Sequence, residues 1–284
     1  MTAFTPAEDR RYARALVESD CIYFELGARL QAVRGASLAC MSSFERTAAG
    51  CVLQRVDLRR MARAPRRWFA AAEDAFRAAG TGLARLYLVT DAPAITAALV
   101  AHGYRHREEI GFIGAADFPA PSPELTLRRL QSAADWADKR RLDEASSRQS
   151  DGYDVEPARW VELERRKSED DGMRCYLVEY RGEPCGAVAT MGLGDFLRMK
   201  NIIVPPAWRR RGLAMEIIRL VAEVARREHR TAFGCFGIAG EAGEALYRHA
   251  GLRVVTSQFE WTRPLAAATR VAPAHMPASL EERS

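Results

Sequence analysis

A basic turn in front of an amphipathic segment is the clearest candidate for chemistry in this sequence. Arg209, Arg210 and Arg211 are followed by Gly212 and by the small residue Ala214. The first turn of a helix has unpaired backbone N–H groups and a partial positive charge, and both favour phosphate oxygens. Glycine also lets the backbone come close to a ligand. The turn therefore predicts a phosphate site; an arginine-rich helix start without a ligand is the alternative.

A strand and a helix must position this turn. The apolar run Met199–Val204 predicts a strand, and Pro205 and Pro206 end it because proline has no N–H for a ladder. From Leu213 onward, apolar residues fall at helical spacing. They are Leu213, Ile217, Leu220, Val221 and Val224. The unit is thus strand, tight basic turn and helix.

The residues downstream predict three more elements. Arg230–Ile238 is typical of a strand, Gly243–Gly251 of a short helix closed by glycine, and Leu252–Thr262 of a further strand. Upstream, the segments Met173–Tyr180 and Pro184–Met191 flank a turn and predict a hairpin. The basic turn thus lies within a sheet of several strands.

Two of these motifs resemble a known family. Val204-x-Pro206 followed by Arg209-x-x-Gly212-x-Ala214 resembles the coenzyme A motif of the GNAT (GCN5-related N-acetyltransferase) acyltransferases. Leu246-Tyr247-x-x-x-Gly251 resembles the LYxxxGF signature of that family, with Leu252 in place of phenylalanine. The resemblance is strong over residues 173–262 and includes the hairpin before the motif strand.

The resemblance implies an acyl-CoA-dependent N-acyltransferase. The expected reaction moves acetyl from acetyl-CoA to a primary amine of a small molecule, with coenzyme A bound as acyl donor and no metal. Tyr247 is the candidate general acid, because a phenol with a pKa of about 10 can protonate a departing thiolate; a tyrosine packed on a helix face is the alternative. The coenzyme A contacts implied by the motif are Ile202, Ile203, Val204, Arg209, Arg210, Arg211, Gly212, Leu213 and Ala214.

The general base stays open. Lys200 stands where many family members have a glutamate on the motif strand, and Gly240 where the family often has an asparagine. The candidates left are Asp195, Glu164, Glu169 and, on the short helix, His249. An acceptor amine that is already partly neutral would need no dedicated base.

The first half of the chain echoes the second. Ala94–Ile113 runs helix, glycine, strand, as Gly243–Trp261 does, and aligning Gly103 with Gly251 gives a weak internal repeat. Arg59–Trp68, in the place of the basic turn, has no Arg-x-x-Gly-x-Ala pattern. We therefore interpret the first copy as degenerate and expect it not to bind coenzyme A.

We expect an α/β (α+β) protein of two GNAT-like domains, each a mixed, mostly antiparallel central sheet flanked by helices. The expected parts are a degenerate N-terminal domain (1–116), a linker (117–123), a catalytic domain (124–265) and a mobile tail (266–284). A first helix is predicted from Thr5-Pro6 to about residue 18, and a strand at Cys21–Leu26.

Length, composition and charge limit the classes of protein that the chain can belong to. With 284 residues, 48% hydrophobic, 28% charged and a net charge of +5, the chain is typical of soluble proteins. It shows no groove-reading motif, no C-x-x-C pair and no membrane-length apolar run, so we expect no nucleic acid, no zinc and no membrane. The six cysteines are expected to be reduced thiols of a cytoplasmic monomer or homodimer. The other functional hypotheses are a non-catalytic acyl-CoA sensor and a nucleic-acid-associated protein.

Overall fold

The computed structural model describes residues 4–45, 50–90, 92–146, 156–169 and 172–265. The expected tail (266–284) lies outside the described residues. The described helices are α1 (Pro6–Glu25), α2 (Leu58–Arg63), α3 (Pro65–Ala78), α4 (Pro93–Ala101), α5 (Ala133–Ser146), α6 (Pro157–Ser168), α7 (Leu213–Arg227) and α8 (Ala242–His249). The strands are β1 (Arg29–Val33), β2 (Ala36–Cys40), β3 (Cys51–Gln54), β4 (Leu83–Leu88), β5 (Arg105–Ala115), β6 (Leu125–Arg129), β7 (Arg174–Tyr180), β8 (Glu183–Leu193), β9 (Phe196–Ile203), β10 (Ala232–Ile238) and β11 (Arg253–Pro264).

The N-terminal helix is longer than the sequence predicts. It begins with a capping box between Thr5 and Glu8 and has Pro6 in its first turn. The strand predicted at Cys21–Leu26 is wrong, because α1 continues to Glu25. Packing of α1 on the sheet outweighs the strand propensity of the aromatic and β-branched residues, because the buried residues fall at helical spacing over the whole helix. The buried residues are Tyr12, Leu16, Ser19, Asp20, Tyr23 and Phe24.

The eleven strands of the described residues form one sheet, in the order β1-β2-β3-β4-β11-β5-β10-β9-β8-β7-β6. Most neighbours are antiparallel, while β3 with β4 and β9 with β10 are parallel. The fold thus confirms a mixed, mostly antiparallel sheet flanked by helices.

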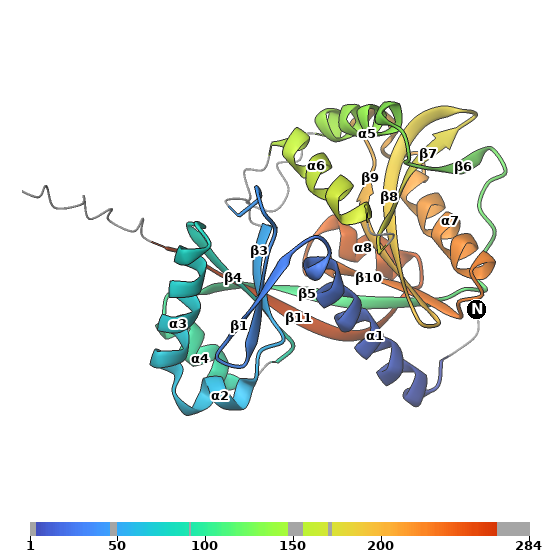
Figure 1. The fold of residues 1–284 in the computed structure, drawn as a ribbon. Coiled ribbons are helices and arrows are strands. Elements are labelled where there is room, and N and C mark those ends of the chain that lie inside the picture. The colour runs from blue at the N-terminus through green and yellow to red at the C-terminus, as the bar shows by residue number, and fades with distance from the viewer. Residues whose placement is uncertain (1–3, 46–49, 91, 147–155, 170–171, 266–284) are drawn as a thin grey trace, which may run out of the picture.

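The last strand of each half lies between strands of the other half. β5 pairs with β10, with Cys235 opposite Phe112, and β11 pairs with β4, with Trp261 opposite Leu86. β5 and β11 also pair with each other and run side by side through the middle of the molecule (Figure 1). Each half therefore completes its sheet with a strand of the other, and the two halves interlock.

The two halves also share one order of elements. α1, β1, β2, β3, α3, β4, α4 and β5 follow the same sequence of types as α6, β7, β8, β9, α7, β10, α8 and β11. α4 and α8 end alike: Gly103 and Gly251 both have positive φ, of 78° and 75°. The next residues, Tyr104 and Leu252, donate N–H bonds back to Leu99 and Tyr247.

Helices cover both faces of the sheet. α7 and α8 pack on one face of the β6–β10 region, where Ile217, Val221 and Phe233 belong to one buried cluster. α5, α6 and the C-terminal part of α1 lie on the other face (Figure 1), and Tyr23, Leu142 and Ala189 share a second cluster there. No helix in the described ranges is long and apolar enough to cross a membrane.

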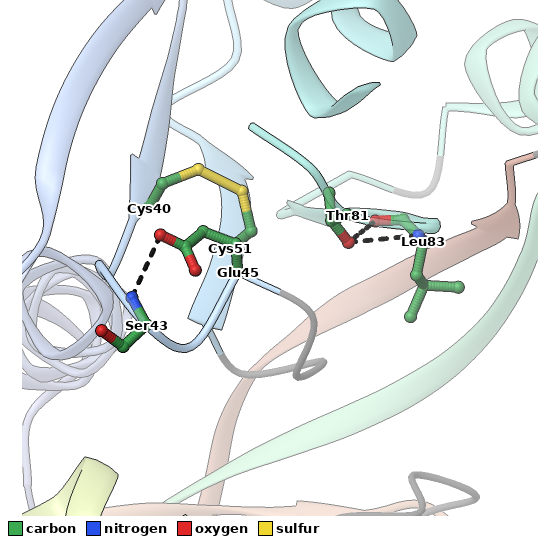
Figure 2. The surroundings of a disulfide bond; sticks show 6 residues. All are labelled: Cys40, Ser43, Glu45, Cys51, Thr81 and Leu83. Atoms are coloured by element: carbon green, nitrogen blue, oxygen red, sulfur yellow. Dashed lines mark hydrogen bonds between the residues drawn. A yellow bond between two sulfur atoms is a disulfide. The ribbon is translucent and has the colours of Figure 1, made fainter. Parts of the chain in front are cut away.

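A disulfide joins Cys40 and Cys51 (Figure 2). These residues are direct partners in the β2–β3 ladder, with their Cα atoms 4.3 Å apart. The expectation that all six cysteines are reduced is therefore wrong for this pair. Pairing of β2 with β3 brings the two thiols together, and no sequence motif reports that register. The free cysteines are Cys21, Cys175, Cys185 and Cys235.

Candidate active site

β9 and β10 separate along their length. Their parallel ladder joins three residue pairs, of which the last is Gly234 with Arg198. Both strands continue, β9 to Ile203 and β10 to Ile238. Beyond Gly234, the edges that face each other have no ladder partner within these two strands. The opening between β9 and β10, called the splay below, therefore exposes backbone N–H and C=O groups to a ligand.

A bulge redirects the motif strand beside the splay. The register between β8 and β9 shifts between Ala187 and Ala189, and Asn201 has a left-handed φ of 54°. Asparagine tolerates this conformation better than most residues. The Asn201 amide donates to Glu164 Oε1 on α6 at 2.6 Å, and Glu164 Oε2 accepts from Lys139 at 2.6 Å. This buried network ties the bulge to α5 and α6.

The basic turn joins the open end of β9 to α7. Gly212 is the N-cap of α7, with a φ of 78°, and no side chain caps the helix. A Cβ at Gly212 would meet no atom within 4 Å, so the space in front of the turn is open. The first-turn N–H groups of α7 therefore face a space that an anion can enter.

The three arginines of the turn differ in their contacts. Arg209 donates to the carbonyls of Val204, at 3.1 Å, and Ser146, at 3.4 Å, and so ties the turn to the residue after β9 and to α5. The Arg211 guanidinium lies 5.2 Å from the centre of the Trp208 ring. Arg210 is exposed and has a left-handed φ of 63°. Arg209 thus shapes the turn, while Arg210 and Arg211 add positive charge at its surface.

Tyr247 lies at the closed end of the splay. Its side chain interacts with that of Cys235, the residue after the last paired position of β10. Its ring packs 5.4 Å from the Phe112 ring and close to Gly237, where an added Cβ would come within 3.0 Å. Burial raises the pKa of Tyr247 well above its usual value, and Cys235 raises it further. The phenol is therefore protonated at neutral pH.

The predicted base candidates lie in different settings. Asp195 forms an ion pair with Arg11 at 2.8 Å and precedes β9, at the end opposite the open splay. Glu164 is buried and bonded through both oxygens. Glu169 and His249 are exposed at helix ends. None of these four residues therefore presents an unpaired carboxylate or imidazole to the splay.

The arrangement of elements is shared with several solved structures. A GCN5-related N-acetyltransferase from Kribbella flavida aligns with a TM-score of 0.64 at 14% identity, covering 89% of this chain and 96% of that one. A tandem GNAT protein from the clavulanic acid biosynthesis pathway aligns with a TM-score of 0.57 at 12% identity, covering 88% and 95%. A functionally unknown conserved protein from Staphylococcus epidermidis has a TM-score of 0.64 at 10% identity, covering 87% and 97%. At these identities the likeness concerns the fold.

Part of the sequence matches a family model. Residues 133–252 match the model of the acetyltransferase (GNAT) family. These residues therefore carry a GNAT domain, which confirms the predicted resemblance over this part of the chain. No curated protein sequence matches the chain.

Several residues around the site could not be predicted. Cys235 is a lone cysteine in an apolar strand, without a motif. Asn201 could have been suspected, since asparagine is enriched at left-handed positions. Asp20 of α1 belongs to no motif either. It nevertheless accepts hydrogen bonds from Lys200 Nζ at 2.7 Å and from Arg198 at 3.2 Å. The N-terminal half thus reaches the motif strand.

Proposed function

We propose that this chain is an acyl-CoA-dependent N-acyltransferase that moves acetyl from acetyl-CoA to the primary amine of a small molecule. One observation carries the proposal: the splay of β9 and β10 opens beside the uncapped start of α7. A long cofactor with a pyrophosphate and an amide-containing arm fits this combination. The N–H groups of the turn suit its phosphates, and the strand edges suit its amides.

The proposed roles follow from position. Gly212, Leu213 and Ala214 would hold the pyrophosphate through backbone N–H groups, with charge added by Arg210 and Arg211. Ile202, Ile203 and Val204 would pair with the cofactor arm and polarise the acyl carbonyl. Tyr247 would protonate the departing thiolate, for which its buried, protonated phenol at the closed end of the splay is suited.

The N-terminal half is proposed to have no coenzyme A site of its own. Its β3 is followed by Arg55, which pairs with Glu18 and Glu25, and then by α2 in place of a glycine turn. We therefore expect one cofactor site per chain, in the part proposed as the catalytic domain (124–265).

Calorimetric titration of acetyl-CoA tests the proposal. We expect one site per chain, and weaker binding for Gly212→Glu. A carboxylate about 4 Å from two phosphate charges costs about 1 kcal/mol for each in water, or roughly 30-fold in affinity. Gly182→Glu is the matched control, since Gly182 also has a positive φ, of 86°, and open space around it.

The outcomes separate the hypotheses. Equal binding of the Gly212→Glu and Gly182→Glu variants would show that the turn is not the pyrophosphate site. Two sites per chain would overturn the assignment of the N-terminal half. Binding without consumption of the thioester, across primary amines of several kinds, would favour a non-catalytic acyl-CoA sensor.

A further inference from the structure

A row of polar side chains crosses the face of the sheet that α1 covers. It connects β9 with strands of the N-terminal half and with β11, and most of its members are buried. The row consists of Asp20, Arg85, Tyr87, Arg107, Glu109, Arg198, Lys200, Gln258 and Glu260. Such a row lowers stability unless every buried charge has a partner of opposite charge or a hydrogen bond.

Two carboxylates of the row are held by cations at short range. Asp20 accepts from Lys200 and Arg198, and its second oxygen accepts from Gln258 Nε2 at 2.8 Å. Glu260 pairs with Arg107 at 2.5 Å and with Arg85. The two cations beside Asp20 hold the pKa of Asp20 well below its usual range, so Asp20 is a poor proton acceptor.

Glu109 of β5 has a different environment. Its Oε2 accepts from the neutral amide of Gln258 at 2.8 Å, and its Oε1 from the Tyr87 hydroxyl at 3.4 Å. A guanidinium nitrogen of Arg107 lies 3.9 Å from Glu109 Oε1. Burial raises the pKa of Glu109, and the negative charges of Asp20 and Glu260 raise it further, against Gln258 and Lys200, which lower it. This carboxylate can exchange a proton closer to neutral pH than an ordinary glutamate.

Its position puts Glu109 beside the splay. β5 is the neighbour of β10, and Glu109 is paired with Ile238, at the end of the segment that forms one wall of the splay. Glu109 and Gly111 are two residues apart on β5, so they lie on the same face of the sheet. A Cβ added at Gly111 would contact Leu16 of α1 and Phe236 of β10, which shows that this face is the one covered by α1. Hydrogen bonds run from Glu109 through Gln258 and Asp20 to Lys200 on the opposite wall.

We propose that Glu109, supplied by the N-terminal half on the exchanged strand β5, is the proton acceptor for the amine substrate. The inference rests on the proposed acyltransferase function and names the base that the motif strand lacks. The acceptor is then a cationic primary amine, because a buried carboxylate attracts an ammonium group and can take its proton.

The reaction balances with the residues described. Glu109 takes one proton from the ammonium, and the neutral nitrogen attacks the thioester carbonyl carbon. The new C–N bond forms, the C–S bond breaks, and the thiolate takes a proton from Tyr247. The nitrogen gives up its second proton, which restores the phenol. In total the ammonium loses two protons: one reaches solvent through Glu109 and one remains on the thiol of coenzyme A.

The exchange of strands between the two halves brings the proposed base to the splay. Glu109 lies in the first half of the chain but pairs with β10 and, through Gln258, with β11. The N-terminal half therefore completes the active site of the C-terminal half, even without a cofactor site of its own.

The test compares Glu109→Gln with Glu108→Gln. Glu108 is the next residue on β5 and points to the opposite face, so the control removes the same charge from the same strand. Acetyl-CoA binding is measured by calorimetry. Thioester consumption is followed from pH 6 to 9 with an α-amino acid, a diamine or an amino sugar as acceptor, and without an added amine as the blank. We expect both variants to bind acetyl-CoA within about twofold of wild type, and Glu109→Gln to lose roughly 10²-fold or more in turnover.

The pH profile identifies the role. Loss of a base removes the rise of kcat/KM with pH, whereas a merely structural change lowers the whole profile without altering its shape. Glu109→Asp, which retains the carboxylate but shortens its reach, should keep the pH dependence at a lower rate. Turnover of Glu109→Gln within threefold of wild type, with the same pH profile, would overturn the inference and leave the proposed function intact. A wild-type protein that neither binds nor consumes acetyl-CoA would overturn both.

Discussion

Replacing Asp20 with asparagine removes the charge at the centre of a buried cluster. Asp20, on α1, is 3% exposed and accepts hydrogen bonds from Lys200 and Arg198 on β9 and from Gln258 on β11. Asparagine has nearly the same shape but is neutral, and one of its two polar atoms is a donor. Two cations would then lie close together in the interior with no carboxylate between them.

The expected loss of stability is large. Removing one partner of a buried ion pair costs about 3–5 kcal/mol, because the remaining charge stays out of water without compensation. At about 1.4 kcal/mol per decade, this is roughly two to three and a half decades in the unfolding equilibrium. Glu18→Gln on the same helix is the matched control. Glu18 pairs with Arg55, with side chains 44% and 37% exposed, and an exposed pair contributes about 0.2–1 kcal/mol.

The pH dependence has a defined sign. Burial raises the pKa of Asp20, but the charges of Lys200 and Arg198 outweigh burial and hold the pKa well below its usual range. A carboxyl group whose pKa is lower in the folded state adds stability above its unfolded pKa of about 3.9. That contribution is lost as the pH falls towards the folded value. The Asp20→Asn variant should therefore lose less stability than wild type between pH 4 and pH 2.

Denaturant unfolding at pH 7 measures both variants against wild type. The reasoning is refuted if Asp20→Asn lowers the free energy of unfolding by less than 1 kcal/mol, or by no more than Glu18→Gln does. It is also refuted if the acid dependence of stability is the same in Asp20→Asn and in wild type.

Two further predictions concern the acid and the cysteines. Tyr247→Phe should lower kcat by about 10²–10⁴-fold and leave the acetyl-CoA dissociation constant within about twofold, as measured by steady-state kinetics and calorimetry; an unchanged kcat would mean that the ring only packs against Phe112. Thiol titration of the unfolded protein without reductant should find four free thiols, because Cys40 and Cys51 are joined and Cys21, Cys175, Cys185 and Cys235 are free. Six free thiols would contradict the bond and support the original expectation from the sequence.

Local sequence signals predicted much of the fold and the core of the candidate site. Proline and glycine bound the basic turn, and the structure ends β9 at Ile203 and begins α7 at Leu213, close to the predicted limits. The exception was Cys21–Leu26, where aromatic and β-branched residues suggested a strand. There the capping box and a continuous buried stripe keep the chain helical to Glu25.

The sequence by itself determined the strand–turn–helix unit, the helix that bears Tyr247 and the family of residues 133–252. These features depend on proline, glycine and apolar spacing, which act over a few residues. Only the tertiary structure decided that β5 lies between β11 and β10, that Cys40 meets Cys51, and that Asp20 and Glu109 stand around the splay. Such contacts join residues far apart in the chain, and the pairing of whole strands sets them, so no local pattern of residue types reports them.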